Sequence, residues 1–99
     1  MAAVPKKLSE TDVTKRLLKI SEWTVNAKNT ELSKSFFVQN FVSGLAFAAR
    51  VAVHAEVMGH HPVLELSSEK VKVRLTTHDV KGLTKLDFDL AKRIDTFSH

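Results

Sequence analysis

Histidines are the side chains of this sequence whose type and spacing best suit chemistry. There are five, and two of them, His60 and His61, stand next to each other between Gly59 and Pro62. A third, His78, follows two threonines at the end of an alternating apolar stretch. An imidazole titrates close to neutral pH, so such residues can both give and take protons. If the fold brings the two stretches together, three imidazoles converge on one pocket.

Two carboxylates are spaced to support these histidines. Glu56 precedes His60 by four residues, so a helix that continued that far would place the two side chains together. Asp87 follows Thr84 by three residues, which is the spacing of a helix capping box, and it could orient another histidine. Each residue alone is more common in a structural role, such as an exposed loop histidine or a capping partner. The combination favours general acid–base catalysis.

Other chemistries lack the residues that they need. The sequence has no cysteine, which excludes disulfides, thiolate metal sites and a thiol nucleophile. Three histidines could ligate zinc, but neighbouring side chains diverge, and neither a His-x-His nor a His-x-x-x-His spacing occurs. The sequence also lacks the Gly-x-Ser-x-Gly elbow of serine hydrolases and a glycine-rich phosphate loop. We therefore expect acid–base chemistry that uses no metal and no cofactor.

The composition is that of one globular domain. Of 99 residues, 43% are hydrophobic and 26% are charged, and the formal net charge is +4. The basic residues are scattered along the chain, and the nearest approach to a stripe is Lys70, Lys72 and Arg74 on one strand face. We therefore expect no nucleic-acid partner.

No segment of the sequence is predicted to direct the chain to a membrane. The lysines at residues 6–7 are followed by polar residues rather than by the apolar core of a secretory signal. The most apolar stretch, residues 41–58, contains Arg50, His54 and Glu56, and its uncharged part is too short to span a bilayer. We expect a cytoplasmic protein that could also enter the nucleus and that has no membrane partner.

The period of the apolar residues divides the chain into the elements that must position these side chains. Residues 1–8 are expected to be a flexible tail, and residues 9–99 a single domain. The expected elements of the domain are a helix from Ser9 to residues 20–22, strands at 23–27 and 31–38, a helix at 41–58, strands at 63–66 and 71–77, and a helix from Thr84. Two hairpins without a parallel crossover imply an α+β fold. In it, a four-stranded antiparallel sheet carries three helices on one face, in the order αββαββα.

The long helix at residues 41–58 is apolar around most of its circumference. Such a helix must be covered on more than one side. The sheet can cover one side, but a chain of 99 residues has little left to cover the other. The small residues Ala48, Ala49 and Ala52 would allow a second helix to approach closely. We expect a self-association surface on this helix.

Three segments taken together carry a family signature. They are Ala-Glu-Val-Met-Gly-His-His-Pro at 55–62, Thr-Thr-His-Asp at 76–79 and Gly-Leu-Thr-Lys-Leu-Asp at 82–87. The sequence resembles the pterin-4a-carbinolamine dehydratases in these segments, and the resemblance extends over residues 9 to 97. It implies the fold described above, in homodimers or homotetramers with strands or the long helix at the subunit contacts. It also implies dehydration of 4a-hydroxytetrahydrobiopterin to quinonoid dihydrobiopterin, which recycles the cofactor of aromatic amino-acid hydroxylases.

The resemblance identifies the site residues by position. They are His60, His61, His78, Glu56, Pro62, Thr77 and Asp87. Loss of water from a carbinolamine needs one proton delivered to the leaving hydroxyl and another removed from a ring nitrogen. We expect His60 and His78 to transfer these protons and His61 to orient the pterin. Glu56 would then orient His60, and a backbone group or the Thr77 hydroxyl could hold the amide-like edge of the pterin.

The sequence departs from the family pattern at Leu64. Members of the family commonly have an aromatic residue, often Trp, two residues after the proline of the His-His-Pro motif. Leu64 can still supply an apolar wall but offers less stacking area. We expect this change to affect substrate affinity more than the chemistry.

A non-catalytic role is the alternative interpretation. Some members of the family act as dimerisation cofactors of a homeodomain transcription factor, and the long apolar helix could serve such a partner. Self-association and association with another protein would use the same surface, so the sequence leaves both open.

Overall fold

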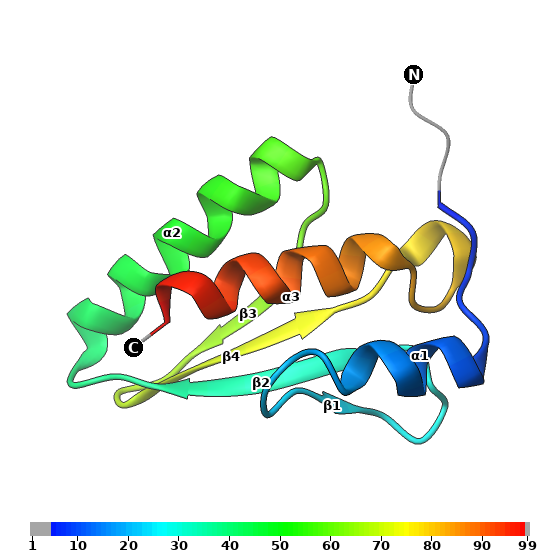
Figure 1. Ribbon diagram of the computed structural model, residues 1–99. Helices are drawn as coiled ribbons and strands as arrows, with labels where there is room; N and C mark the ends of the chain where they lie inside the picture. Colours follow the sequence, from blue (N-terminus) through cyan, green and yellow to red (C-terminus); the bar gives the residue numbers. More distant parts are fainter. Residues whose placement is uncertain (1–4, 99) are drawn as a thin grey trace.

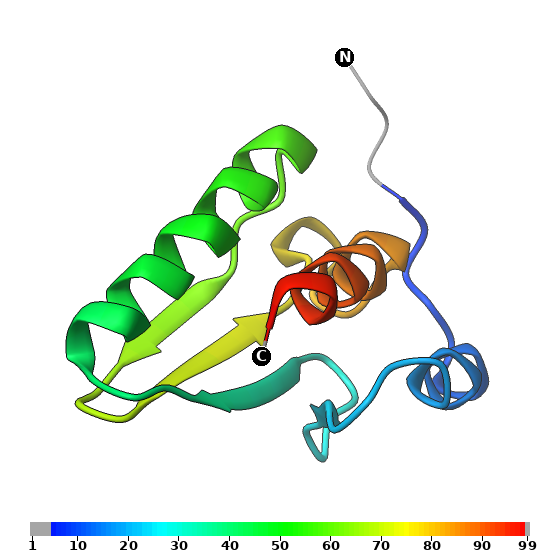
Figure 2. The same cartoon turned by 60° about the vertical axis from the view of Figure 1, so that its left-hand side comes forward.

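The computed structural model describes residues 5–98 and shows a sheet with helices on one side. Its elements are α1 (Glu10–Leu17), β1 (Thr24–Val25), β2 (Leu32–Phe37), α2 (Phe41–Met58), β3 (Val63–Leu66), β4 (Lys70–Leu75), the 3-10 turn η1 (His78–Val80) and α3 (Lys85–Phe97). The strands form one antiparallel sheet in the order β1-β2-β4-β3. Helices α2 and α3 lie over one face of it (Figures 1 and 2). The predicted α+β fold and its αββαββα order are confirmed.

The register of the two central strands determines which residues enter the core. Leu32 of β2 lies opposite Leu75 of β4, and Phe36 lies opposite Val71. All four are buried, because successive residues of a strand point to opposite faces and these share the face beneath the helices. Ser33 and Ser35 of β2, with their partners Arg74 and Lys72 of β4, point the other way and form the open face of the sheet.

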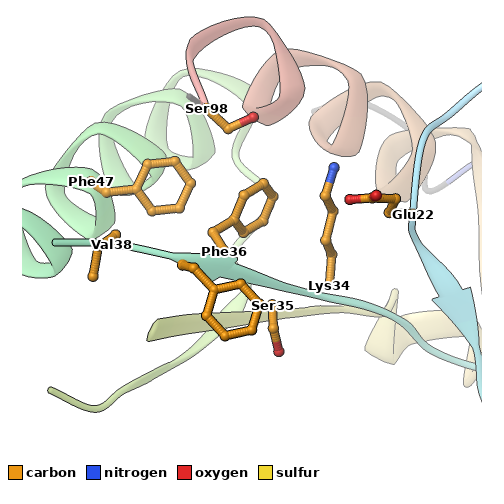
Figure 3. A pocket seen from close by; sticks show the side chains of 8 residues that line it. Glu22, Lys34, Ser35, Phe36, Val38, Phe47 and Ser98 are labelled. Atoms are coloured by element: carbon orange, nitrogen blue, oxygen red, sulfur yellow. The ribbon is translucent and has the colours of Figure 1, made fainter. Parts of the chain in front are cut away.

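Lys34 is a charged residue on the core face of β2. Figure 3 shows Lys34 and Phe36 on the helix side of the strand and Ser35 on the other side. The Nζ of Lys34 lies 2.9 Å from Asp95 Oδ1 and 4.9 Å from the ring centre of Phe36. The carboxylate and the aromatic face offset the cost of placing an ammonium group there, so the strand keeps its register despite the polar residue.

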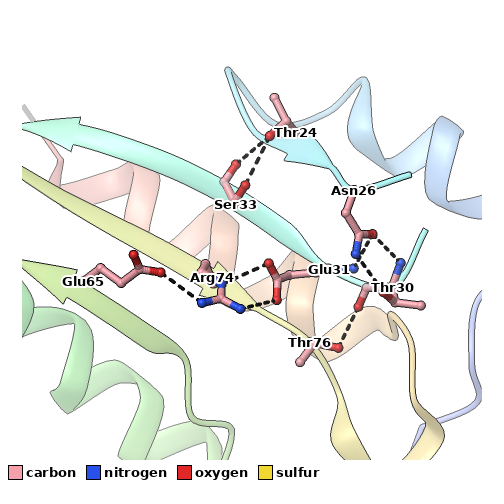
Figure 4. A network of polar contacts seen from close by, with 8 residues as sticks. All are labelled: Thr24, Asn26, Thr30, Glu31, Ser33, Glu65, Arg74 and Thr76. Atoms are coloured by element: carbon pink, nitrogen blue, oxygen red, sulfur yellow. Dashed lines mark hydrogen bonds and ion pairs between the residues drawn. The ribbon is translucent and has the colours of Figure 1, made fainter. Parts of the chain in front are cut away.

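The open face of the sheet carries a polar network (Figure 4). The Nε of Arg74 donates to Glu31 at 3.0 Å, and its Nη1 donates to Glu65 at 3.0 Å. These hydrogen bonds, that to Glu31 first, raise the pKa of Arg74 above its ordinary value. Two carboxylates therefore offset the charge of one member of the Lys70, Lys72 and Arg74 stripe.

Helix α1 is shorter than predicted. It ends at Leu17, whereas the apolar spacing favoured an end at residues 20–22. After the helix, the chain forms a turn in which the N–H of Ile20 donates to the carbonyl of Leu17, three residues earlier, at 3.3 Å. Glu22 then takes a left-handed conformation with φ of 66°, which turns the chain towards β1. Ile20 still packs against the core, so its place in the apolar pattern indicated burial and not a continuation of the helix.

The predicted flexible tail lies partly outside the described residues, because residues 1–4 are not among them. At the end of that segment, the N–H of Leu8 donates to the carbonyl of Leu83 at 2.8 Å. The Leu8 side chain also packs against the core. The chain is therefore attached to the domain immediately before the Ser9 cap of α1.

Helix α2 has the predicted bounds. The Asn40 side chain accepts from the N–H of Ser43 at 2.8 Å, and Gly59 ends the helix in a left-handed conformation with φ of 62°. The buried residues of α2, which include Ala48, Val51 and Ala55, are spaced as one helix face. Such a stripe against a sheet is typical of a globular domain, although α2 is the one described helix long and apolar enough to cross a membrane.

The remaining circumference of α2 is not covered by residues 5–98. Its large apolar residues there are between half and three-quarters exposed, namely Phe41, Val42, Leu45, Val53 and Val57. The sequence predicted that this helix needs cover on more than one side. Residues 5–98 of the chain supply cover on one side only.

Candidate active site

Asp87 is the buried centre of the candidate site. It occupies the first turn of α3, its side chain is 0% exposed, and three donors approach its carboxylate. The N–H of Thr84 and the hydroxyl of Thr77 donate to Oδ2 at 2.9 and 2.8 Å. The Nε2 of His60 lies 2.6 Å from Oδ1. An ionised carboxylate only accepts, so we assign the proton of that contact to Nε2, which leaves Nδ1 as the acceptor of the neutral ring.

The hydroxyl groups around Asp87 form a directed chain. The hydroxyl of Thr77 donates its hydrogen to Asp87, so Thr84 must be the donor in the 2.9 Å contact between the Thr77 and Thr84 hydroxyls. The Thr84 oxygen in turn accepts from the N–H of Leu86 at 3.2 Å. Every donor and acceptor in this chain is therefore assigned, which fixes the carboxylate and through it the His60 ring. The predicted capping box of Thr84 and Asp87 is confirmed.

The end of α2 turns His60 into the interior. With Gly59 left-handed, the N–H of His60 donates to the Ala55 carbonyl at 3.0 Å, and the N–H of Gly59 donates to Glu56 at 3.1 Å. These two bonds make a Schellman motif, which reverses the chain immediately after the helix. The His60 side chain is 9% exposed as a result.

The predicted contact between Glu56 and His60 is wrong. Glu56 Oε1 lies 2.6 Å from Nε2 of His61, and both side chains are mostly exposed. The prediction assumed that the helix continues to residue 60. Because the helix ends in a turn at Gly59, His61 rather than His60 lies beside Glu56. Asp87 takes the place beside His60 that was expected for Glu56.

Thr77 joins the two distant stretches of sequence. It is 5% exposed and its hydroxyl is bound to Asp87, so it does not offer the free hydroxyl predicted to hold a pterin edge. His78 follows at the start of η1 and is exposed. Residues 60 and 77 therefore meet through Asp87, while the rings of His61 and His78 lie at the surface. Leu64 and Pro62 are both half-buried, and Leu64 packs against the core.

Two hollows in the described part of the chain lie away from these histidines. One of about 250 Å³ is lined by residues that include Lys34, Phe36, Phe47 and Ser98 (Figure 3). A neighbouring one of about 370 Å³ shares Phe47 and extends to Arg50. Both adjoin the first half of α2, whereas His60 follows its last turn. A pocket that all three histidines line thus stays a prediction.

Residues 5–98 contain no group of three or more His, Cys, Asp or Glu side chains arranged to hold a metal ion. The buried histidine–carboxylate pair can instead hold and orient a proton. The part played by the Thr84 hydroxyl was not predicted, because a threonine at an N-cap is already explained by the cap. Its seven-residue separation from Thr77 gave no signal of contact.

Comparison with known proteins identifies the family. A family model described as pterin 4 alpha carbinolamine dehydratase matches residues 6–97. A relative from Roseiflexus sp. (strain RS-1) is 43% identical over 89 residues, which is 90% of this chain and 94% of that protein. A relative from Chloroflexus aggregans is 40% identical over the same shares. Both are named, provisionally, as pterin-4-alpha-carbinolamine dehydratases.

Solved structures give the same result. A crystal structure from Brucella melitensis, described as a transcriptional coactivator/pterin dehydratase, matches with a TM-score of 0.89 and 26% identity. The match covers 95% of this chain and 100% of that chain. A pterin dehydratase-like protein described as a RuBisCO assembly factor in the alpha-carboxysome shares the fold at 22% identity and a TM-score of 0.64, over 76% of this chain and 87% of its own. The chain belongs to the pterin-4-alpha-carbinolamine dehydratase family.

Proposed function

We propose that this protein dehydrates 4a-hydroxytetrahydrobiopterin to quinonoid dihydrobiopterin and so recycles the cofactor of aromatic amino-acid hydroxylases. The observation that carries the proposal is the buried contact of 2.6 Å between His60 and Asp87. A structural histidine at a helix end does not need a carboxylate that is itself held by a hydroxyl and a backbone N–H. Such an arrangement suits a ring whose tautomer must be fixed for proton transfer.

The reaction consists of two proton transfers around the loss of water. The leaving hydroxyl receives a proton as its bond to C4a breaks, and the neighbouring ring nitrogen loses its proton as the C=N bond forms. His60, held through Nε2, offers Nδ1 for one transfer. His78 is the second group, and His61 with Glu56 orients the pterin. The chemistry is complete with imidazoles and water, so the proposal needs no cofactor.

A stopped-flow assay on freshly made 4a-hydroxytetrahydropterin tests the proposal. We expect His60→Ala and His78→Ala each to lower the dehydration rate by about 100-fold or more, as the loss of a general acid or base does. His54→Ala is the matched control, because His54 stacks on Phe97 at 4.8 Å and belongs to neither stretch. Wild-type rates in both His60→Ala and His78→Ala would disprove the assignment.

We also propose that α2 pairs with α2 of another copy to form a homodimer or homotetramer. The support is the exposed apolar face of α2, on which Val42 is 74% and Val57 is 72% exposed. A contiguous apolar surface of this kind marks an interaction site. We expect Val53→Glu to reduce the mass measured by light scattering to that of a monomer. An unchanged mass would place the interface elsewhere.

A second candidate function is a non-catalytic binding module for a transcription factor. The same face of α2 supports it, together with the Brucella melitensis relative described as a transcriptional coactivator. A pull-down with a candidate factor, made with His60→Ala protein, separates the two functions. A binding module would retain its partner in that variant although dehydration is lost.

A further inference from the structure

A hollow of about 240 Å³ lies between α1 and α3, away from the histidines. Four of its six lining residues are cations and one is an acid; the six are Asp12, Lys15, Arg16, Lys19, Phe88 and Lys92. They come from α1 and the residues just after it, where Lys19 lies, and from α3, which is far away in the sequence (Figure 1). We call this hollow the α1–α3 cation pocket. At full ionisation its side chains carry a charge of 4 − 1 = +3.

The four cations lack the ion pairs that other basic residues of this protein make. Lys34 and Arg74 each contact a carboxylate. No carboxylate in the described part of the chain lies within ion-pair distance of the four pocket cations. Within the described residues, no direct ion pair relieves their mutual repulsion.

Helix stability explains only part of this arrangement. Lys15 and Arg16 lie in the last turn of α1, where cations favourably oppose the helix dipole. Lys92 lies in the middle of α3, so the dipole of that helix gives no reason for a cation there. Lys92 instead shares the hollow with the basic end of α1.

The framework of the pocket is rigid. Phe88 lines it and is 1% exposed, and Val13 of α1 is 1% exposed in the same core cluster. Because both helices are anchored in one core, the cations cannot separate by moving their backbones apart. A fixed cluster of like charges in a concave surface concentrates anions of matching size.

We infer that the α1–α3 cation pocket binds a chain of two or three phosphate groups. A charge of +3 exceeds what one phosphate would neutralise, and it matches the charge of a di- or triphosphate. The volume is below the roughly 300–1,000 Å³ of typical ligand pockets, so the part held must be compact. The guanidinium of Arg16 can engage a phosphate with two parallel hydrogen bonds. The phosphate chain can belong to an inorganic oligophosphate or to a nucleotide.

Calorimetric titration with pyrophosphate, tripolyphosphate and ATP, without magnesium and at low salt, tests the inference. We expect all three to bind the wild-type protein, with an affinity that falls steeply as salt increases. The double variant Arg16→Gln/Lys19→Gln should weaken binding by about 10-fold or more. The matched control Lys28→Gln/Lys70→Gln removes the same charge from exposed positions outside the pocket and should change the affinity less than about two-fold.

A charge change of opposite sign makes the test sharper. Asp12 is the acid of the pocket, so Asp12→Asn should tighten binding of pyrophosphate by about three-fold. ATP bound more tightly than tripolyphosphate would identify a nucleotide as the ligand, and equal affinities would identify the phosphate chain alone. Absence of binding at millimolar pyrophosphate, or equal losses in pocket and control variants, would overturn the inference. The dehydration rate of Arg16→Gln/Lys19→Gln should stay at the wild-type value, so the two proposals can fail separately.

Discussion

Two adjacent histidines in this protein each contact a carboxylate at the same distance, in opposite surroundings. His60 lies 2.6 Å from Asp87, with side chains 9% and 0% exposed. His61 lies 2.6 Å from Glu56, with side chains 62% and 76% exposed. An exposed pair gains little, because water and salt screen it and two side chains lose freedom. A buried pair cannot be broken without leaving polar atoms unsatisfied. The two contacts have the same length, but we expect the buried one to contribute much more to the free energy of unfolding.

The difference between the pairs comes from the backbone of one residue. The left-handed turn at Gly59 directs His60 under the end of α2 and leaves His61 beside the last turn of the helix. The buried hydrogen bond to Asp87 fixes the tautomer of the first ring, whereas exposure to water leaves the second ring free to rotate. We expect fixed proton geometry at His60 and adjustable contact with substrate at His61.

Removing the buried carboxylate has the largest expected effect. Asp87→Ala leaves the N–H of Thr84, the hydroxyl of Thr77 and the Nε2 of His60 without their acceptor. A buried donor left without its acceptor costs about 1–3 kcal/mol, so the loss of an acceptor shared by three donors should lower the free energy of unfolding by about 3 kcal/mol or more. Urea denaturation measures it, and Asp89→Ala on the same helix, where Asp89 is only half-buried, is the control. A loss of similar size in both variants would remove the contrast between buried and exposed carboxylates.

Replacing the buried carboxylate by its amide tests the tautomer directly. In Asp87→Asn the amide can present its N–H₂ to His60, which would then have to accept at Nε2 and carry its proton on Nδ1. If the proposed function holds, the dehydration rate should fall by about 100-fold or more. Nitrogen chemical shifts of the His60 ring should report the exchange of protonated nitrogens. An unchanged ring spectrum together with a wild-type rate would show that Asp87 does not set the tautomer.

Much of this arrangement could be predicted from the sequence, because local signals set the element ends. Asn40 and Gly59 define α2, and Thr84 with Asp87 defines the start of α3. A local signal can also conceal a second role of the same residue. The capping box already accounts for an aspartate at the third position of a helix, so the local pattern did not identify which histidine Asp87 contacts. The additional use of Asp87 as the acceptor for His60 depends on a contact across 27 residues. No local pattern encodes such a contact.

The exchange of carboxylate partners was beyond the reach of spacing rules. Glu56 and His60 have the four-residue spacing of helical neighbours, but the rule applies only while the helix continues. The sequence marked Gly59 as the end of the helix without specifying the direction of the chain after it. Similarly, the alternation of residues in β2 places Lys34 on the apolar face, but no local pattern indicates its partner Asp95, 61 residues later.

Thr77 should have an intermediate effect, because it supports the buried pair from one side. Thr77→Val keeps the shape but removes the hydroxyl that donates to Asp87 at 2.8 Å. Loss of a hydrogen bond to a buried charged group costs about 1.5–3 kcal/mol of the free energy of unfolding. Thr77→Ser retains the hydroxyl and should recover most of that loss. If serine and valine are equally destabilising, the methyl group rather than the hydrogen bond stabilises this position.

The exposed pair of Glu56 and His61 should show the smallest effect. It tests whether an exposed contact contributes as little to stability as the comparison of the two histidines implies. Glu56→Gln removes the charge next to His61 and leaves both side chains in water. We expect the free energy of unfolding to change by about 0.5 kcal/mol or less, and we expect 1 M salt to abolish that difference because the pair is screened. The same salt should leave the effect of Thr77→Val unchanged, since that contact is buried. A loss above about 2 kcal/mol in Glu56→Gln would mean that the pair is shielded from water, for example by a second copy of the chain, and that the two histidines are energetically alike.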